Sequence, residues 1–119
     1  WAELMSECAK RPNVYGKFSG LNTASGTNWT IDDWKPYMDH MVKEFGANRI
    51  MTGGDWPVAI LANTYTEVWK AQRALIEKYG ADDQQWLFHK TAKNFYKIYQ
   101  PMFGWASSPL RAMRKWCST

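Results

Sequence analysis

Apolar residues recur at helical spacing near the start of the chain, and a short β-rich run follows them. The apolar stripe consists of Trp1, Leu4, Met5, Cys8 and Ala9. Pro12 ends this helix. Residues 13–20, NVYGKFSG, are rich in β-forming side chains and close on Ser-Gly, so they predict a strand. Residues 21–28 have the Ser, Thr, Asn and Gly content of a loop.

A second amphipathic helix and a second strand occupy the middle of the chain. Thr30 followed by Asp33 resembles a capping box, and Gly46 stops the helix that it starts. The apolar face of this helix consists of Trp34, Tyr37, Met38, Met41, Val42 and Phe45. Residues 49–54, RIMTGG, predict a second short strand, and residues 55–63 predict a loop.

Two more helices are expected after this loop. Thr64 and Glu67 form another capping-box pair, and the third helix runs to about Tyr79, before the stop signal Gly80. The apolar positions of the fourth helix are Phe88, Ala92, Phe95, Tyr96 and Tyr99. Pro101 closes this helix, and residues 101–119 form a weakly patterned tail with a short helix from Leu110.

The order of these elements predicts an α/β fold. Strands that are separated by helices pair in parallel. Two parallel strands leave both edges of the sheet open and cannot be covered stably. The other strands are therefore expected upstream of Trp1, and the alternative is that an oligomer supplies them.

The composition indicates one soluble globular unit. Of the 119 residues, 45% are hydrophobic and 22% are charged, and no apolar run approaches the roughly 20 residues of a membrane helix. Cys8 and Cys117 have neither metal-ligand nor redox spacing, so we expect reduced thiols and a cytoplasmic protein. Because the chain begins at Trp1 without a methionine, its true N-terminus, with or without a signal peptide, is expected upstream.

The basic residues do not by themselves indicate a nucleic-acid partner. The net charge is +4, and much of the excess lies in the C-terminal part of the chain. A solvated helix face and tail explain it, since no nucleic-acid-binding motif accompanies the charge. The sequence also lacks a phosphate-binding loop, a dinucleotide fingerprint and a nucleophile elbow.

Asp55 is the strongest candidate for chemistry. It follows an apolar strand directly, at the end where parallel α/β proteins collect their ligand sites. Gly53 and Gly54 let the backbone bend and let a substrate or metal approach closely, and Pro57 stiffens the departing loop. The alternative is ordinary turn chemistry, since Asp after Gly often starts a turn.

Further candidates surround the two strand ends. Lys17 and Ser19 point to the same side of the first strand and could line a substrate site. The alternatives are an outward side chain or a structural ion pair for Lys17 and a turn residue for Ser19. Trp29 and Trp56 lie in the loops that leave the strands, where aromatic faces could stack on sugar-like rings. For Trp34 we expect core packing, because it opens the apolar stripe of its helix.

The two histidines are expected at the surface. His40 and His89 lie outside the apolar faces of their helices, and neither has a second His or Cys at ligand spacing. The sequence therefore contains no self-sufficient metal site, and any metal would need ligands from elsewhere.

Four features occur in order along residues 1 to about 99: NVYGKFSGL, a loop Trp, WKPYMDHMVKEFGANRIMTGGDWPV and FHKTAKNFYKIY. Together they resemble the C-terminal part of the amidohydrolase-related family, close to its sugar lactonases. The family fold is a (β/α)8 TIM barrel of about 250 residues. The resemblance implies that residues 1–100 are the last two βα units and extra helices of such a barrel, without its upstream strands.

The resemblance also implies roles for the candidate residues. Asp55 would activate or position the attacking water and could bind one divalent metal, Zn or Mn, with upstream histidines, although a metal-free enzyme is equally compatible. Lys17, Ser19, Trp29 and Trp56 would contact the substrate. Relatives commonly carry Ser at the position of Gly54, so this chain lacks a hydroxyl that could orient the Asp55 carboxylate. Relatives often carry Gly-Asn-Ala where this chain has Lys90-Thr91-Ala92, a difference that affects local contacts of the last helix.

The expected reaction of the complete protein is hydrolysis of a sugar lactone by an Asp55-activated water. The present chain alone is expected to be inactive, because general base and electrophilic stabiliser must converge on one carbonyl. The alternatives are a metal-dependent amidohydrolase or decarboxylase that acts on another small carboxylated ring, and a non-catalytic sugar-binding barrel. The expected partner is a small-molecule substrate, with no nucleic acid or membrane; a homo-oligomer stays open.

Overall fold

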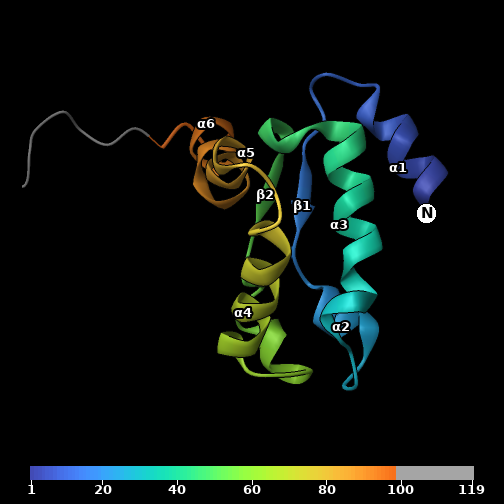
Figure 1. The fold of residues 1–119 in the computed structure, drawn as a ribbon, viewed down its shortest axis with the longest axis vertical. Helices are drawn as coiled ribbons and strands as arrows, with labels where there is room; N and C mark the ends of the chain where they lie inside the picture. The colour runs from blue at the N-terminus through green and yellow to red at the C-terminus, as the bar shows by residue number, and fades with distance from the viewer. Residues whose placement is uncertain (99–119) are drawn as a thin grey trace, which may run out of the picture.

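Two short parallel strands form the centre of the structure. The computed structural model describes residues 1–98. Strand β1 (Gly16–Phe18) pairs in parallel with β2 (Ile50–Thr52), and Lys17 lies opposite Met51. Both strands run toward the end of the molecule that carries α2 and the start of α4 (Figure 1). The predicted parallel α/β arrangement is confirmed, although each strand is shorter than its predicted range.

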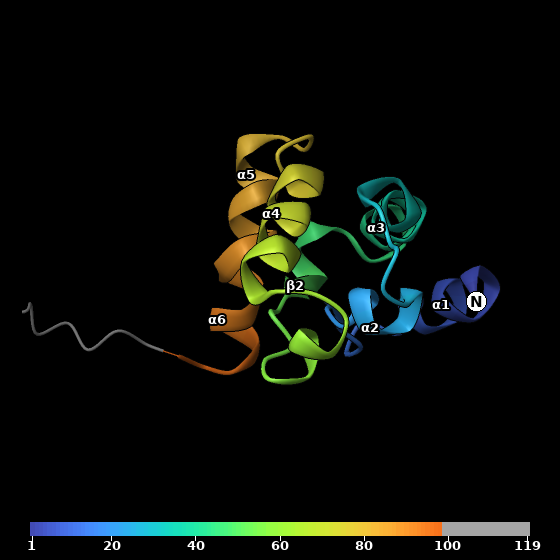
Figure 2. The same cartoon turned by 90° about the horizontal axis from the view of Figure 1, so that it is seen from below.

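Two long helices cover one face of these strands. Helix α3 (Ile31–Phe45) and helix α4 (Tyr65–Ile76) lie side by side on the same face (Figures 1 and 2). Helix α1 (Ala2–Ala9) packs against α3. We call the strand face toward α3 and α4 the covered face, and the opposite one, which presents Lys17, the open face.

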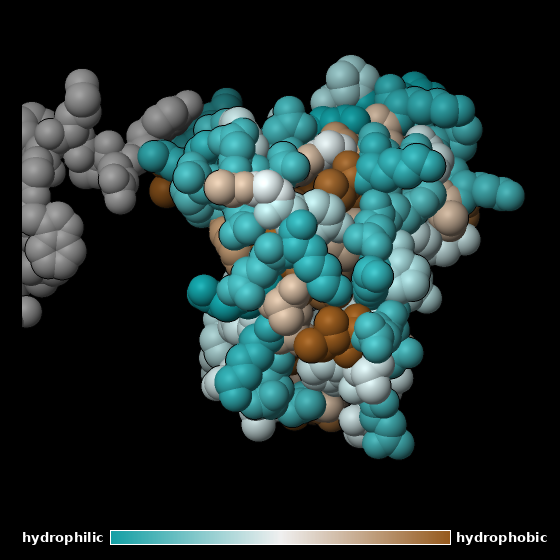
Figure 3. Space-filling view, in the orientation of Figure 1, coloured by the Kyte–Doolittle hydropathy of each residue, from teal (hydrophilic) through white to brown (hydrophobic). Residues whose placement is uncertain are grey.

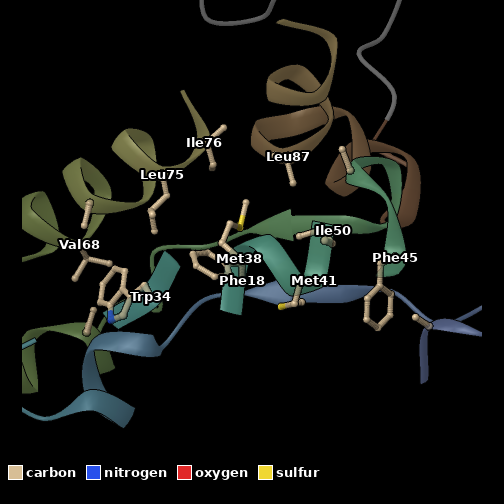
Figure 4. Close-up of a cluster of buried hydrophobic side chains, with 14 residues drawn as sticks. Phe18, Trp34, Met38, Met41, Phe45, Ile50, Val68, Leu75, Ile76 and Leu87 are labelled. Atoms are coloured by element: carbon tan, nitrogen blue, oxygen red, sulfur yellow. The ribbon is translucent and has the colours of Figure 1, made fainter. Parts of the chain in front are cut away.

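The hydrophobic core fills the space between the covered face and the helices. Burial alternates along β1, so that Gly16 and Phe18 are buried and Lys17 between them is exposed. The labelled core side chains of Figure 4 are Phe18, Trp34, Met38, Met41, Phe45, Ile50, Val68, Leu75, Ile76 and Leu87. The predicted role of Trp34 in the core is confirmed. Tyr37, which was assigned to the same apolar face, is exposed instead.

Both predicted helix starts are confirmed. The Thr30 N–H donates to the Asp33 carboxylate over 2.7 Å, which completes a capping box at the start of α3. This hydrogen bond and a second one, which the Thr30 hydroxyl donates to the same carboxylate over 2.9 Å, lower the pKa of Asp33. At α4 the Glu67 N–H donates to the Thr64 hydroxyl over 3.2 Å. Helix α4 ends at Ile76, earlier than predicted, and Gly80 precedes helix α5 (Ala81–Gln85).

The loop predicted over residues 21–28 is wrong in its first part. Helix α2 (Leu21–Ser25) starts there, after Gly20 in the left-handed region at φ 72°. The Thr23 hydroxyl donates to the Gly20 carbonyl over 2.9 Å, and Asn22 is completely buried. Polar residues of loop-like composition thus form a helical turn because tertiary contacts satisfy them. A 3₁₀ turn, Val58–Leu61, likewise interrupts the loop predicted over residues 55–63.

The predicted face of the fourth helix is right for Phe88, which packs against the core, and wrong for Phe95 and Tyr96. A π-helical segment, Trp86–Lys90, separates α5 from α6 (Thr91–Phe95). Each π turn shifts the side-chain register by one residue. As a result Leu87 and Thr91 are buried, while Phe95 is exposed, as is Tyr96 just beyond the helix. Tyr99, Pro101 and the tail helix from Leu110 lie outside the described residues.

The surface toward the viewer in Figure 3 is mainly hydrophilic, with small hydrophobic patches. Within residues 1–98, none of the helices is both long and apolar enough to cross a membrane.

The apolar stripe predicted for α1 is largely solvent-exposed, since Trp1, Leu4 and Cys8 all lie at the surface. Cys117 falls in the part of the chain that the structure does not describe, so the state of the two thiols stays a prediction.

Candidate functional site

The candidate residues gather where the two strands end. Neighbouring parallel strands place their carboxyl ends at the same edge, and here α2 and the 3₁₀ turn flank that edge (Figure 2). A Cβ built on Gly53 would lie 3.1 Å from Cε of Lys17 and 3.5 Å from Cβ of Ser19. Lys17 and Ser19 of one strand therefore lie directly beside the end of the other strand.

Asp55 joins this group from the turn that follows β2. A Cβ built on Gly20 would lie 3.1 Å from the Asp55 Oδ2 atom. The carboxylate therefore lies against the chain directly after Ser19. Among residues 1–98, no ion pair involves Lys17 or Asp55, so neither charge is neutralised by a close partner there. The structure thus brings Asp55, Lys17 and Ser19 together at the carboxyl ends of the two strands. We call these three residues the strand-end group.

The backbone of Asp55 is strained. Its φ of 50° lies in the left-handed region, which non-glycine residues rarely adopt, although Asp is among the more tolerant ones. The Ala59 N–H donates to the Asp55 carbonyl over 2.8 Å and closes the turn. Such strain persists only where the surroundings determine the conformation, and it is frequent at functional sites.

Two buried carboxamides that the sequence did not single out hold this turn. The Gln72 amide donates to the Gly53 carbonyl over 2.9 Å, and the Asn22 amide donates to the Ala59 carbonyl over 2.8 Å. Gln72 could have been noticed, because it occupies a core position of α4 at helical spacing from Val68. Asn22 had no such signal, since Asn is ordinary in a loop.

Gly54 lies toward α4. A Cβ at this position would lie 2.4 Å from Cε2 of Tyr65 and 2.7 Å from Nε1 of Trp69, so the absent side chain makes room for these two rings. The two rings meet edge to face, with centroids 6.2 Å apart. A Ser at this position would have to displace Tyr65 or Trp69. Only Gly53 faces Lys17 and Ser19.

The two loop tryptophans differ in exposure. Trp56 is 64% exposed beside the Asp55 turn, so its ring is accessible from solvent. Trp29 is half-buried and stacks on Trp34, with ring centroids 4.1 Å apart and an interplanar angle of 22°. A substrate could reach the outer face of Trp56 without rearrangement, whereas Trp29 is already engaged with the core. Their substrate contacts stay predictions.

The expectation of surface histidines is right for His89 and wrong for His40. His89 is exposed. His40 is half-buried between α1 and α3, where its Nε2 lies 3.0 Å from the Ala2 carbonyl oxygen and 3.2 Å from the Ser6 hydroxyl. His40 therefore joins two helices and lies outside the strand-end group.

The described residues do not by themselves fit a metal site. Over residues 1–98, no cluster of three or more His, Cys, Asp or Glu side chains is close enough to bind an ion. Asp55 offers a single carboxylate, and the neighbouring Lys17 is a cation. A metal at Asp55 thus stays a prediction that requires ligands from other segments.

The family model described as Amidohydrolase matches residues 1–98. The chain belongs to the amidohydrolase family. This match confirms the resemblance inferred from the strand and turn motifs. It covers all the residues that the structure describes, including the strand-end group around Asp55.

Individual relatives of this amidohydrolase chain point to the same family. The uncharacterized protein y4mH of Sinorhizobium fredii is 32% identical over 98 residues, which are 82% of this chain and 33% of that protein. The L-fucono-1,5-lactonase of Burkholderia ambifaria is 35% identical over 105 residues, 85% of this chain and 36% of the lactonase. The chain spans about a third of the length of these curated relatives.

A solved structure shows the same fold. The amidohydrolase of Burkholderia multivorans, crystallised with bound Zn, superposes with a TM-score of 0.77 at 30% identity. The superposition covers 83% of this chain and 37% of that protein. A second crystal structure of the Burkholderia multivorans amidohydrolase, with bound HEPES, matches equally well.

Proposed function

We propose that the chain is the C-terminal part of a (β/α)8 barrel hydrolase that opens a sugar lactone. The observation that carries the proposal is the position of Asp55, held in a strained turn at the end of β2 with Lys17 and Ser19 beside it. The lactonase-named relatives support the substrate class. Their greater length supports upstream strands that pair with the open sheet edges.

Asp55 acts as the general base of the proposed reaction. Its carboxylate takes a proton from water while the water oxygen attacks the lactone carbonyl carbon. The bond between this carbon and the ring oxygen then breaks, and the ring oxygen takes the proton from Asp55, so that a hydroxy acid leaves. Carbonyl polarisation is assigned to groups of the upstream segments. Lys17 and Ser19 bind polar groups of the substrate, and Trp56 packs against its ring.

The bound Zn of the Burkholderia multivorans amidohydrolase supports a divalent metal in the complete protein. Asp55 would be one of its ligands, and upstream histidines would be the others. Because Asp55 is the single carboxylate that the described residues supply at this site, no step of the mechanism above is assigned to a metal.

Replacing Asp55 in the complete protein tests this proposal. The variant Asp55→Asn removes the base and is expected to lower kcat for lactone hydrolysis by about 10²-fold to 10⁴-fold. The matched control is Asp83→Asn, because Asp83 is an exposed carboxylate of α5, at the opposite end of the strands, and should leave kcat unchanged. A near-wild-type rate for Asp55→Asn, measured with a pH-stat, would sink the assignment.

The bound Zn also favours a second candidate, a metal-dependent amidohydrolase that acts on another small carboxylated ring. This candidate is selected if the complete protein turns over ring amides or carboxylates but not lactones. The activity should also be lost on chelation and restored by Zn. Calorimetric binding of a lactone without turnover selects a non-catalytic sugar-binding barrel instead.

A further inference from the structure

We infer that the buried carboxamides of Asn22 and Gln72 are positioning residues that hold the Asp55 turn from both sides. The inference rests on the proposed function of Asp55 and adds two residues to it. Both side chains are almost completely buried, with exposed fractions of 0% for Asn22 and 2% for Gln72.

The two carboxamides reach the turn from different helices. Gln72 extends from α4 and donates to the Gly53 carbonyl, directly before the turn. Asn22 extends from α2 and donates to the Ala59 carbonyl, directly after it. The Ala59 N–H in turn donates to the Asp55 carbonyl, so a chain of two hydrogen bonds joins Asn22 to Asp55. The segment 53–59 is therefore fixed at both ends.

Asp55 requires such support. Its φ of 50° is unfavourable for a residue with a side chain, so the turn would relax if its ends were released. Within residues 1–98, no side-chain hydrogen bond or ion pair orients the carboxylate itself. The backbone of the turn is thus the means by which the described residues place this group.

Side-chain packing alone does not explain the two carboxamides. Within residues 1–98, the Asn22 Oδ1 and Gln72 Oε1 atoms are both buried without a hydrogen-bond partner. A buried oxygen without a partner is unfavourable, whereas an apolar side chain of the same size would pack at the same position without this cost. The amide donors are therefore explained by the two turn carbonyls that they bind.

Isosteric replacements in the complete protein test the inference. Gln72→Met keeps an unbranched side chain and Asn22→Leu keeps the branching at Cγ, and both remove the donor. Each is expected to lower kcat by about 10-fold to 100-fold with little change in KM, because a displaced base loses its alignment with the bound water. The matched control is Gln84→Met, because the Gln84 amide also binds a backbone carbonyl, that of Tyr79 over 2.8 Å, far from the turn. Gln84→Met should leave kcat unchanged.

A double variant separates positioning from general support of the fold. If Gln72 acts through Asp55, Gln72→Met adds no loss once Asp55 has become Asn, since residues that act as a unit are not additive. An equal additional loss in the Asp55→Asn background would overturn the inference, as would unchanged kcat in both single variants. If Gln72→Met does not fold, Asn22→Leu takes its place in the same double variant with Asp55→Asn, because it releases the other end of the turn.

Hydrogen exchange distinguishes failure of this inference from failure of the proposed function. The Ala59 amide should exchange faster in Gln72→Met and Asn22→Leu than in the wild type, and at the wild-type rate in Gln84→Met. Unchanged exchange in the first two variants overturns the positioning role whatever the activity. Wild-type turnover by Asp55→Asn, together with faster exchange in both variants, refutes the proposed function and leaves the carboxamide contacts established.

Discussion

The two faces of the same two strands are built for different purposes. The covered face presents Phe18 and Ile50 to the helices, and both are buried in the core. The open face presents Lys17 and Ser19, whose side chains border Gly53, directly before the Asp55 turn. Because side chains alternate along a strand, one residue step separates a position that stabilises the fold from one that can meet a substrate. Met51 departs from this division, since it pairs with Lys17 and is nevertheless buried.

Removing a large side chain behind the covered face should have the largest effect on stability. Trp34→Ala is expected to lower the free energy of unfolding of the complete protein by about 3–5 kcal/mol, because it leaves a cavity in the core beside Trp29. Urea denaturation measures this change. The matched control is Trp56→Ala, since Trp56 is 64% exposed and should change stability by less than about 1 kcal/mol. Equal losses in the two variants would break the comparison between buried and open positions.

A substitution of Gly54 tests whether the chain after β2 is closely packed against α4. Gly54→Ser introduces the residue that we associate with relatives and is expected to destabilise by about 1–3 kcal/mol, because its Cβ would meet the Tyr65 and Trp69 rings. Truncation of Tyr65 to Ala should remove most of this penalty in a double-mutant cycle. Gly80→Ser is the control, since nothing lies within 4 Å of a Cβ there. Additive effects of Gly54→Ser and Tyr65→Ala would show that the rings do not require the glycine.

Lys17 tests the open face. Lys17→Met is expected to lower kcat/KM for the lactone about 10-fold, which equals about 1.4 kcal/mol of transition-state binding. Its effect on the free energy of unfolding should stay within about 0.5 kcal/mol, because the side chain is exposed. Lys78→Met, an exposed lysine in the segment after α4, serves as the control for loss of charge. A large loss of stability with unchanged kcat/KM would reverse the roles of the two faces.

The capping box of α3 should give the smallest effect, and it depends on pH. Thr30 lowers the pKa of Asp33 below its ordinary value of 3.8. Its stabilising contribution is therefore complete above pH 3.8 and is lost as the pH falls through the lower folded-state pKa. Asp33→Asn should lower Tm at neutral pH, and the difference from the wild type should vanish in strong acid. Asp32→Asn keeps the capping bond and serves as the control; a Tm difference that does not change with pH would contradict the assignment.

Much of the fold could be predicted because its signals are local. The alternation around Lys17 and the cap at Thr30 depend on residues a few positions apart, and both are confirmed by the structure. The position of Asp55 after an apolar strand could also be seen, since parallel strands collect ligand sites at this edge. Helix α2 and the π segment could not be predicted, because they make contacts with distant parts of the chain. Asn22 of α2 donates to the Ala59 carbonyl, and the Leu87 carbonyl of the π segment accepts from the Thr52 hydroxyl.

The sequence by itself determined the parallel strands, most of the apolar face of α3, the start of α4, the family and the location of Asp55 in the chain. Only the tertiary structure decided how the Asp55 turn is held and which glycine faces which element. Gln72 and Asn22 meet the turn from 19 and 37 positions away along the chain, and no periodicity records such contacts. The physical reason is that a buried amide gains its role only when the folded chain brings a carbonyl within hydrogen-bond distance.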